Sequence, residues 1–138
     1  MKAIGLVPEL LVKDLKNSLE FYLNIIGFEV LYGREEEGFV YIKKGNAEIM
    51  LEQIGIGRNW VTKDLEYPLG RGVNFQIEVE NVDALYQTFI NSKAPIFMHI
   101  EEKWYGHIQK SVGNKQFCVQ DPDGYLLRFY KNLVEKHV

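Results

Sequence analysis

A weak internal repeat constrains what this chain can fold into more than any other feature does. Residues 12–22 parallel residues 79–89, so that Asp14 corresponds to Asn81 at an offset of 67 residues. Each copy is typical of a strand end, an Asp or Asn helix cap and an amphipathic helix. A second correspondence, at an offset of 78 residues, joins residues 45–51 to residues 123–129. The repeat predicts two βαβββ modules and therefore an α+β fold.

The predicted elements divide the chain into two modules, a connection and a tail. Module one spans residues 1–53, the connection 54–71, module two 72–131 and a polar tail 132–138. We expect strands at 4–12, 28–32, 39–43, 47–53, 73–79, 96–101, 116–120 and 125–130, and helices from Asp14 to Gly27 and from Asn81 to Asn91. We expect residues 102–114 to form an irregular loop, and the tail either to fray or to lie over a neighbouring subunit.

The composition excludes several classes of function. With Cys118 as the single cysteine among 138 residues, the chain forms no internal disulfide and no Cys-rich zinc site. The formal net charge is −3 and no cluster of Lys and Arg is present, so we expect neither nucleic acid nor an anionic membrane as the partner. No signal-peptide pattern or membrane-spanning run is present, and we expect a cytoplasmic protein. Cys118 itself is expected to be an inert core residue.

Strand alternation assigns one face of each expected sheet to the helices and leaves the other face largely polar. Phe75, Ile77 and Val79 alternate with polar residues, because residues two apart share one side of a sheet. The face away from the helices is expected to carry Val7, Glu9, Leu11, Glu48, Met50, Glu52, Asn74, Gln76, Glu78, Leu126, Arg128 and Tyr130. Two interpretations stay open: a solvated face of a flat sheet, or a curled sheet whose polar face lines a cleft.

Large aromatic residues stand in the segments expected to be loops. Trp60 lies in the connection, and Trp104 and Tyr105 lie in the expected loop of module two. One interpretation is that they stack on a planar or cationic ligand at the mouth of a cleft. The other is that they fold back to fill the core or a dimer interface.

Two motifs resemble the vicinal oxygen chelate superfamily, which includes glyoxalase I, extradiol dioxygenases and bleomycin-resistance proteins. They are residues 12–28, from VKDLKNSLEFY to IIGF, and residues 121–129, DPDGYLLRF. The resemblance covers nearly the whole chain and implies paired βαβββ modules whose curved, mixed sheets form a cup.

The resemblance also implies where a metal would be held in members that are enzymes. Those positions correspond here to Val7, Met50, Asn74 and Arg128. None is a good ligand for a divalent cation, and the guanidinium of Arg128 repels one. The three histidines, His99, His107 and His137, form no facing pair in the expected elements. We therefore predict that the chain has no metal or other cofactor and no catalytic residue.

What remains resembles the bleomycin-resistance branch, which implies a homodimer that sequesters a small molecule. The surplus of glutamates on the expected face favours a cationic ligand, and the loop tryptophans favour a planar one. The predicted ligand-binding residues are Glu9, Glu48, Met50, Glu52, Trp60, Asn74, Gln76, Trp104, Tyr105, Arg128 and Tyr130. In this set Arg128 either neutralises a carboxylate of the protein or holds an acid group of the ligand. One alternative is a metal-dependent glyoxalase- or dioxygenase-type enzyme with a displaced site at Glu9, Glu52 and a loop histidine. Another is an interaction module filled by a partner's segment.

Overall fold

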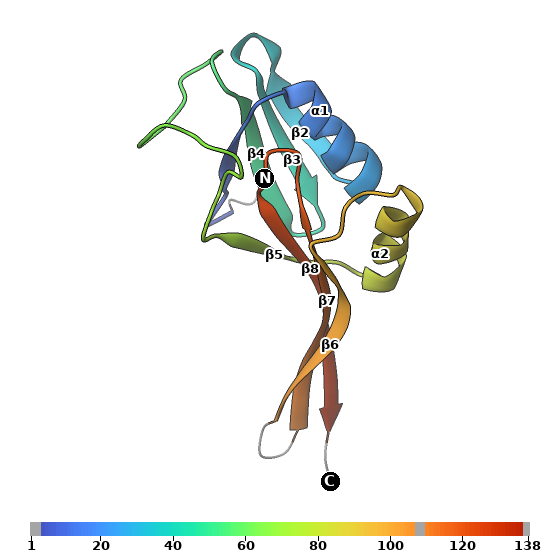
Figure 1. The fold of residues 1–138 in the computed structure, drawn as a ribbon. Helices are drawn as coiled ribbons and strands as arrows, with labels where there is room; N and C mark the ends of the chain where they lie inside the picture. The colour runs from blue at the N-terminus through green and yellow to red at the C-terminus, as the bar shows by residue number, and fades with distance from the viewer. Residues whose placement is uncertain (1–3, 107–109, 137–138) are drawn as a thin grey trace. The chain divides into compact units, whose positions relative to one another are not determined.

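The computed structural model describes residues 4–106 and 110–136. The chain divides into two compact units, residues 1–69 and residues 70–138. Each unit consists of a four-stranded mixed sheet with one helical segment between its first and second strands. This is the predicted α+β arrangement of two βαβββ modules (Figure 1).

In the first unit, the first strand pairs with the last strand along the chain. Its elements are β1 (Glu9–Val12), α1 (Leu15–Leu19), the π-helix η1 (Glu20–Ile26), β2 (Glu29–Arg34), the 3-10 turn η2 (Glu35–Glu37), β3 (Phe39–Lys44) and β4 (Ala47–Gln53). The strand order is β1-β4-β3-β2, with β1 parallel to β4 and the other pairs antiparallel. The first strand starts five residues later than the expected 4–12, at Glu9.

The helical segment of the first unit has the predicted ends. The Asp14 side chain accepts a hydrogen bond from the Asn17 amide (3.3 Å), and Gly27 ends the segment in the left-handed conformation with φ 98°. From Glu20 onward the helix has π geometry in place of α geometry, and the sequence did not indicate this change. Tyr22, within this π-helical part, is fully buried. Its ring packs edge-on against Phe28, with ring centroids 5.6 Å apart.

The second unit has the same topology with longer strands. Its elements are β5 (Asn74–Glu78), α2 (Val82–Asn91), β6 (Met98–Gly106), β7 (Lys110–Gln120) and β8 (Leu126–Lys136), in the order β5-β8-β7-β6. Phe89 of α2 packs on Phe117 and Phe129, with ring centroids 5.7 and 6.1 Å away. All three rings are buried and form the centre of this unit's core.

The strand registers confirm both repeat offsets. Glu9 pairs with Met50 across β1 and β4, and Gln76 pairs with Arg128 across β5 and β8. Glu9 and Gln76 are 67 residues apart, and Met50 and Arg128 are 78 apart, so the two pairs are equivalent. The caps also correspond, because Asn81 accepts from the Ala84 amide (3.0 Å) as Asp14 does from Asn17.

Two predictions about irregular segments are wrong. Most of residues 102–114, expected to be a loop, belong to the paired strands β6 and β7, and residues 132–136 of the expected frayed tail continue β8. Trp104 lies opposite Gly113, where the Cβ of any larger residue would stand only 2.6 Å from the Trp104 ring. A glycine that suggests a loop in the sequence therefore makes room for an indole inside a sheet. In Figure 1, β6, β7 and β8 continue well past α2.

The fold predicts that truncating the central ring of the second unit is costly. Phe89→Ala should lower the free energy of unfolding by about 3–5 kcal/mol, because it removes a buried ring and leaves a cavity between Phe117 and Phe129. Urea denaturation followed by circular dichroism measures the change. Ile90→Ala, at the exposed neighbouring position, is the control and should cost under about 1 kcal/mol. Equal losses from both variants would contradict this account of the core.

Candidate functional site

In the first unit, aromatic and acidic side chains share the sheet face opposite the helix. We call this surface the tyrosine–glutamate face. It consists of Glu9, Tyr32, Phe39, Tyr41, Glu48, Met50 and Glu52. The register explains it, since Met50 lies beside both Glu9 and Tyr41, and Tyr41 lies beside Tyr32. Directly paired residues project from the same side of a sheet, so four strands contribute to one surface.

Two tyrosines of this face form a stack. The rings of Tyr32 and Tyr41 are stacked with centroids 5.3 Å apart and planes 29° apart. Tyr32 also contacts Phe39 (6.0 Å between centroids), and the guanidinium of Arg34 lies 4.2 Å over the Phe39 ring. Tyr32 is exposed, so this group of rings offers an aromatic surface to a planar molecule.

The stacked Tyr41 is hydrogen-bonded to one of the predicted glutamates. Its hydroxyl donates to Glu48 Oε1 across 2.6 Å. This bond to the carboxylate, together with partial burial and the nearby charge of Glu48, raises the pKa of Tyr41 to about 12. Tyr41 is thus held as a neutral donor, and the Glu48 carboxylate is fixed beside the stack.

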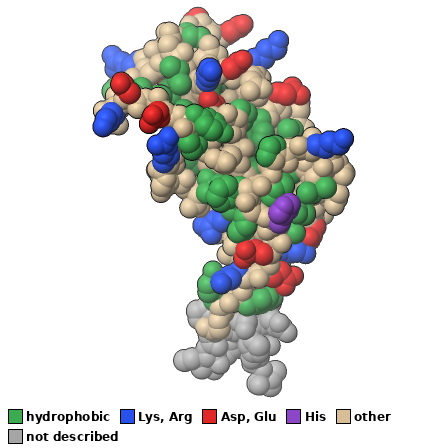
Figure 2. Space-filling model, viewed as in Figure 1, with side chains coloured by type: hydrophobic (Ala, Val, Ile, Leu, Met, Phe, Trp, Pro, Cys, Tyr) green, Lys and Arg blue, Asp and Glu red, His purple; other side chains and the backbone are tan. Residues whose placement is uncertain are grey.

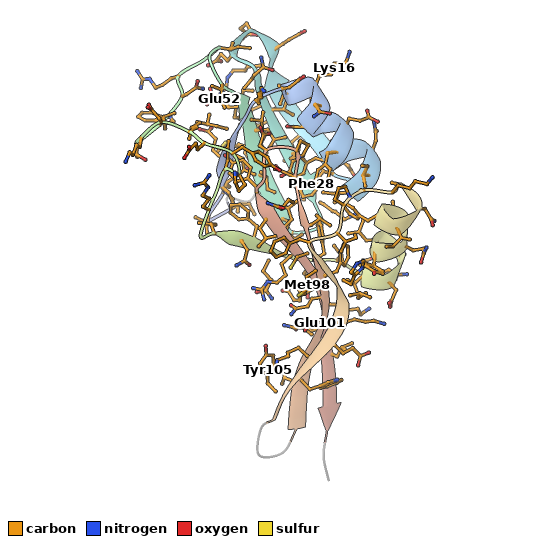
Figure 3. The ribbon with its side chains drawn as sticks, viewed as in Figure 1. Lys16, Phe28, Glu52, Met98, Glu101 and Tyr105 are labelled. Atoms are coloured by element: carbon orange, nitrogen blue, oxygen red, sulfur yellow. The ribbon has the colours of Figure 1, made fainter. Side chains whose placement is uncertain are left out.

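Glu52 is the most unusual member of the face because it is an acidic side chain in a buried place. Only 6% of its surface is exposed, and its Oε2 has no hydrogen-bond partner among the described residues. Gly57 closes over it, since a Cβ at position 57 would lie 2.7 Å from Glu52 Oε1. Figure 3 labels Glu52 beside the loop that follows β4. A buried carboxylate without a partner is costly, so this site calls for a hydrogen-bond donor or a cation.

A second carboxyl group lies near Glu52. Partial burial raises the pKa of Glu9, and so does the nearby charge of Glu52, while Arg34 opposes the shift. The two acidic groups therefore lie close enough to repel each other when both are charged. A bound cation would relieve this repulsion.

In the second unit, an arginine and two amides share the equivalent face, which we call the arginine–amide face. It consists of Asn74, Gln76, Glu78, Glu101, Gln116, Cys118, Arg128 and Tyr130, because Glu78 pairs with Tyr130 and Glu101 pairs with Gln116. Arg128 Nε donates to Asn74 Oδ1 (3.2 Å) and Nη2 donates to Gln76 Oε1 (3.1 Å). Arg128 is thus bonded to amides, and among the described residues it forms no ion pair with a carboxylate.

Two buried residues of β7 complete this second face. Cys118 pairs with Arg128, and Gln116 pairs with Tyr130. Cys118 is buried, as predicted, and burial raises the pKa of its thiol, which makes it a poor nucleophile. Gln116 is 8% exposed, and its Oε1 lacks a partner among the described residues.

Of the three predicted aromatic anchors, Trp60 and Trp104 lie outside these two faces, whereas Tyr105 projects from the same side of β6 as Glu101 and so from the side of the arginine–amide face. Trp60 is 71% exposed in the segment after β4, with the Arg58 guanidinium 5.1 Å over its ring. Trp104 lies on β6, packs over Gly113 and donates from Nε1 to Glu102 (3.3 Å). Tyr105 follows it on the same strand, where Figure 3 labels it far along the strand from Met98. Trp104 and Tyr105 are thus strand residues and not loop residues.

Sequence reasoning missed six members of the faces, namely Tyr32, Phe39, Tyr41, Glu101, Gln116 and Cys118. The signal was available, because all six lie in segments expected to be strands and alternation assigns faces there as well. The expected faces included only the first and last strand of each module. The stack of Tyr32 on Tyr41 also depends on a bulge between Val30 and Tyr32, which the sequence did not indicate.

The residues present do not fit a divalent metal at the four positions that the resemblance implied. Val7 and Met50 offer no hard ligand, and Asn74 is engaged by Arg128, whose charge opposes a cation. Among residues 4–106 and 110–136, no group of three or more His, Cys, Asp or Glu side chains is placed to hold a metal. His99 contacts Tyr86 Oη (2.7 Å), whereas His107 and His137 lie outside the described residues.

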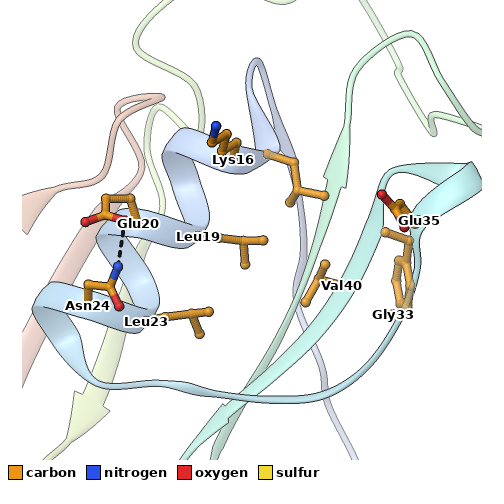
Figure 4. A pocket seen from close by; sticks show the side chains of 10 residues that line it. Lys16, Leu19, Glu20, Leu23, Asn24, Gly33, Glu35 and Val40 are labelled. Atoms are coloured by element: carbon orange, nitrogen blue, oxygen red, sulfur yellow. Dashed lines mark hydrogen bonds between the residues drawn. The ribbon is translucent and has the colours of Figure 1, made fainter.

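An apolar groove also lies in the first unit, beside the helical segment, and Phe39 of the tyrosine–glutamate face is among the residues that line it. It has a volume of about 650 Å³ and runs between the helical segment and strands β2 and β3 (Figure 4). Leu15, Leu19 and Leu23 line one side and Val40 the other. These leucines are only half-buried.

The charged surface shows no concentration of one sign on the side seen in Figure 2, where acidic and basic side chains are interspersed. No helix in the described part of the chain is long and apolar enough to cross a membrane.

Comparison with known proteins gives one family across most of the chain. Residues 6–129 match the family described as the glyoxalase/bleomycin resistance protein/dioxygenase superfamily. A bleomycin resistance protein from Geobacillus stearothermophilus is 26% identical over 139 aligned positions, covering 92% of this chain and 96% of that protein.

Two solved structures show the same fold. TioX from Micromonospora sp. ML1 has a TM-score of 0.72 at 18% identity, over 95% of this chain and all of that one (100%). Lactoylglutathione lyase from Agrobacterium tumefaciens has a TM-score of 0.61 at 18% identity, over 94% of this chain and 93% of that one. At these identities the likeness concerns the fold alone.

The Tyr41–Glu48 hydrogen bond predicts an altered tyrosine titration. In the unmodified protein, Tyr41 should lose its proton near a pKa of about 12, and in Glu48→Gln the pKa should fall towards the ordinary value of 10.0, because the carboxylate that disfavours the phenolate is gone. NMR of protein labelled at the tyrosine ring Cζ follows the titration, with Tyr41→Phe to assign the signal. The same Tyr41 pKa with and without Glu48 would refute the assignment.

Proposed function

Because the chain belongs to the glyoxalase/bleomycin resistance protein/dioxygenase superfamily, we propose that it is a metal-independent protein that binds and sequesters a small organic molecule. The proposed ligand carries a planar group and a cationic group. The first is expected to stack on Tyr32 and Tyr41, and the second to lie against Glu52 and Glu9. Sequestration requires affinity and sufficient protein, and no transition state has to be stabilised.

One observation carries the proposal, namely the unpartnered oxygen of Glu52. Folding leaves only 6% of this residue exposed to solvent, while one oxygen of its carboxylate lacks a donor among the described residues. Such an arrangement lowers stability in the free protein, and a ligand cation would supply the missing partner. The stacked tyrosines beside it favour the same class of ligand, because aromatic faces attract cations and planar groups.

The metal-dependent alternative has less support from the side chains. It requires Glu9 and Glu52 together with a loop histidine; His107 of the expected loop lies outside the described residues, and within them no group of three His, Cys, Asp or Glu side chains is placed to hold a metal. We therefore place no metal in the proposed mechanism.

Bleomycin is the first ligand to test, since relatives that match 92% of this chain carry the name bleomycin resistance protein. Glu52→Gln should weaken the binding of metal-free bleomycin at least about tenfold, which is about 1.4 kcal/mol. The same substitution should raise the free energy of unfolding, because it removes a buried charge and keeps the shape of the side chain. Isothermal titration calorimetry and urea denaturation give the two quantities, and metal analysis of the purified protein accompanies them.

Glu36→Gln is the matched control, since Glu36 is an exposed glutamate of the same unit. It should change neither quantity beyond error. Equal affinity for bleomycin in the Glu52→Gln variant would refute the role of Glu52. A stoichiometric metal in the purified protein would refute metal independence.

We also propose that the chain forms a homodimer. The supporting observation is the edge strand β2, on which Val30, Leu31 and Tyr32 are all exposed although they are large and hydrophobic. Light scattering after size exclusion should give about twice the chain mass of 16.1 kDa. Leu31→Lys should shift the protein towards the monomer, and a monomeric unmodified protein would contradict the proposal.

A further inference from the structure

The arginine–amide face of the second unit contains a cation that forms no ion pair with a carboxylate of the described residues. Arg128 bonds two neutral oxygens, those of Asn74 and Gln76. A guanidinium has five N–H groups, so three remain without an acceptor among residues 4–106 and 110–136. The two hydrogen bonds fix the plane of the guanidinium, and the amides hold it without cancelling its charge.

The orientation of the two amides adds further donors. Since Asn74 and Gln76 both present their oxygen to Arg128, their NH₂ groups are left to donate elsewhere. Asn74 and Gln76 are exposed, and Arg128 is half-buried, so the group is open to a ligand. A fixed guanidinium flanked by two amide donors matches the acceptor oxygens of a carboxylate.

Gln116 provides an independent observation on the same face. Phe117 and Phe129 point to α2, so Gln116, Cys118 and Arg128 project from the opposite side of their strands. Only 8% of Gln116 is exposed, and its Oε1 has no donor among the described residues. Buried carbonyl oxygens normally have a partner, so this one points to a donor supplied by a bound molecule.

We propose that this face binds the carboxylate of a hydroxy- or amino-carboxylic acid. Arg128 and the two amides take the carboxylate, and Gln116 Oε1 accepts a hydrogen bond from the neighbouring hydroxyl or amine. The proposal rests on the proposed function as a ligand-binding protein and names the chemical class of molecule that the face of the second unit takes. It assigns Arg128 to the ligand's acid, the second of the two roles that the sequence left open.

Mandelate is a suitable probe because it has both a carboxylate and an adjacent hydroxyl. Titrated into ¹⁵N-labelled full-length protein, it should shift the side-chain NH₂ signals of Asn74 and Gln76 saturably. Phenylacetate lacks the hydroxyl and should bind at least about threefold more weakly, since Gln116 Oε1 stays unpartnered. Mandelamide, which is neutral, should bind more weakly still.

Three variants distinguish the effect of the Arg128 charge on mandelate binding from an effect on folding. Arg128→Gln should weaken mandelate binding at least about tenfold, whereas Arg128→Lys should retain part of it, because the ammonium keeps the charge without the fixed fork. Lys131→Gln is the matched control, since it removes a cation from an exposed position of the same strand, where Lys131 bonds the Glu80 carbonyl. It should leave mandelate binding unchanged. A dispersed spectrum for each variant establishes that it is folded.

The outcomes distinguish this inference from the proposed function. No shift of the Asn74 and Gln76 signals with mandelate, or equal binding by Arg128→Gln, would overturn the inference even if bleomycin bound through Glu52. Tighter binding of inorganic phosphate than of mandelate would overturn the assignment to a carboxylate. Mandelate binding that depends on Arg128, in a protein that does not bind bleomycin, would support the acid site while refuting bleomycin as the ligand.

Discussion

The parallel pairing of the first and last strand in each unit is the constraint on which the rest of the structure depends. The chain must pass through a helix and two further strands before the last strand can lie beside the first, and this holds for both β1 with β4 and β5 with β8. The pairing sets Glu9 beside Met50 and Gln76 beside Arg128. Because paired residues share a face, it also decides which polar side chains meet. The composition of both faces is therefore a consequence of register.

The two units place different polar groups on this common frame. In the first unit the face gathers carboxylates around stacked tyrosines, and in the second the equivalent face carries an arginine held by amides. Each face also contains one buried polar oxygen without a partner among the described residues, Glu52 Oε2 and Gln116 Oε1. Packing alone does not favour such atoms, because an unpaired buried oxygen lowers stability. These two atoms lower the stability of the free protein, and their presence on equivalent faces is consistent with ligand binding at both faces.

The sequence predicted the fold closely and the faces in part. The caps at Asp14 and Asn81 and the alternation in β5 and β8 are local signals, and local geometry follows from them. The expected loop at 102–114 was wrong because charged and glycine residues weaken the strand pattern, whereas pairing with β8 and the packing of Trp104 on Gly113 stabilise the strands. Propensity describes a residue alone, but a strand is stabilised by its neighbours.

By itself, the sequence determined the two modules, their helix caps, the parity of their strands and the lack of suitable metal ligands at Val7, Met50, Asn74 and Arg128. These properties depend on the order and chemistry of residues near one another in the chain. Only the tertiary structure decided that Arg128 bonds amides and not carboxylates, that Tyr41 stacks on Tyr32, and that Glu52 is buried beneath Gly57. Those contacts depend on register, on a bulge in β2 and on how a later loop packs over the sheet, and such long-range geometry is not expressed in local periodicity.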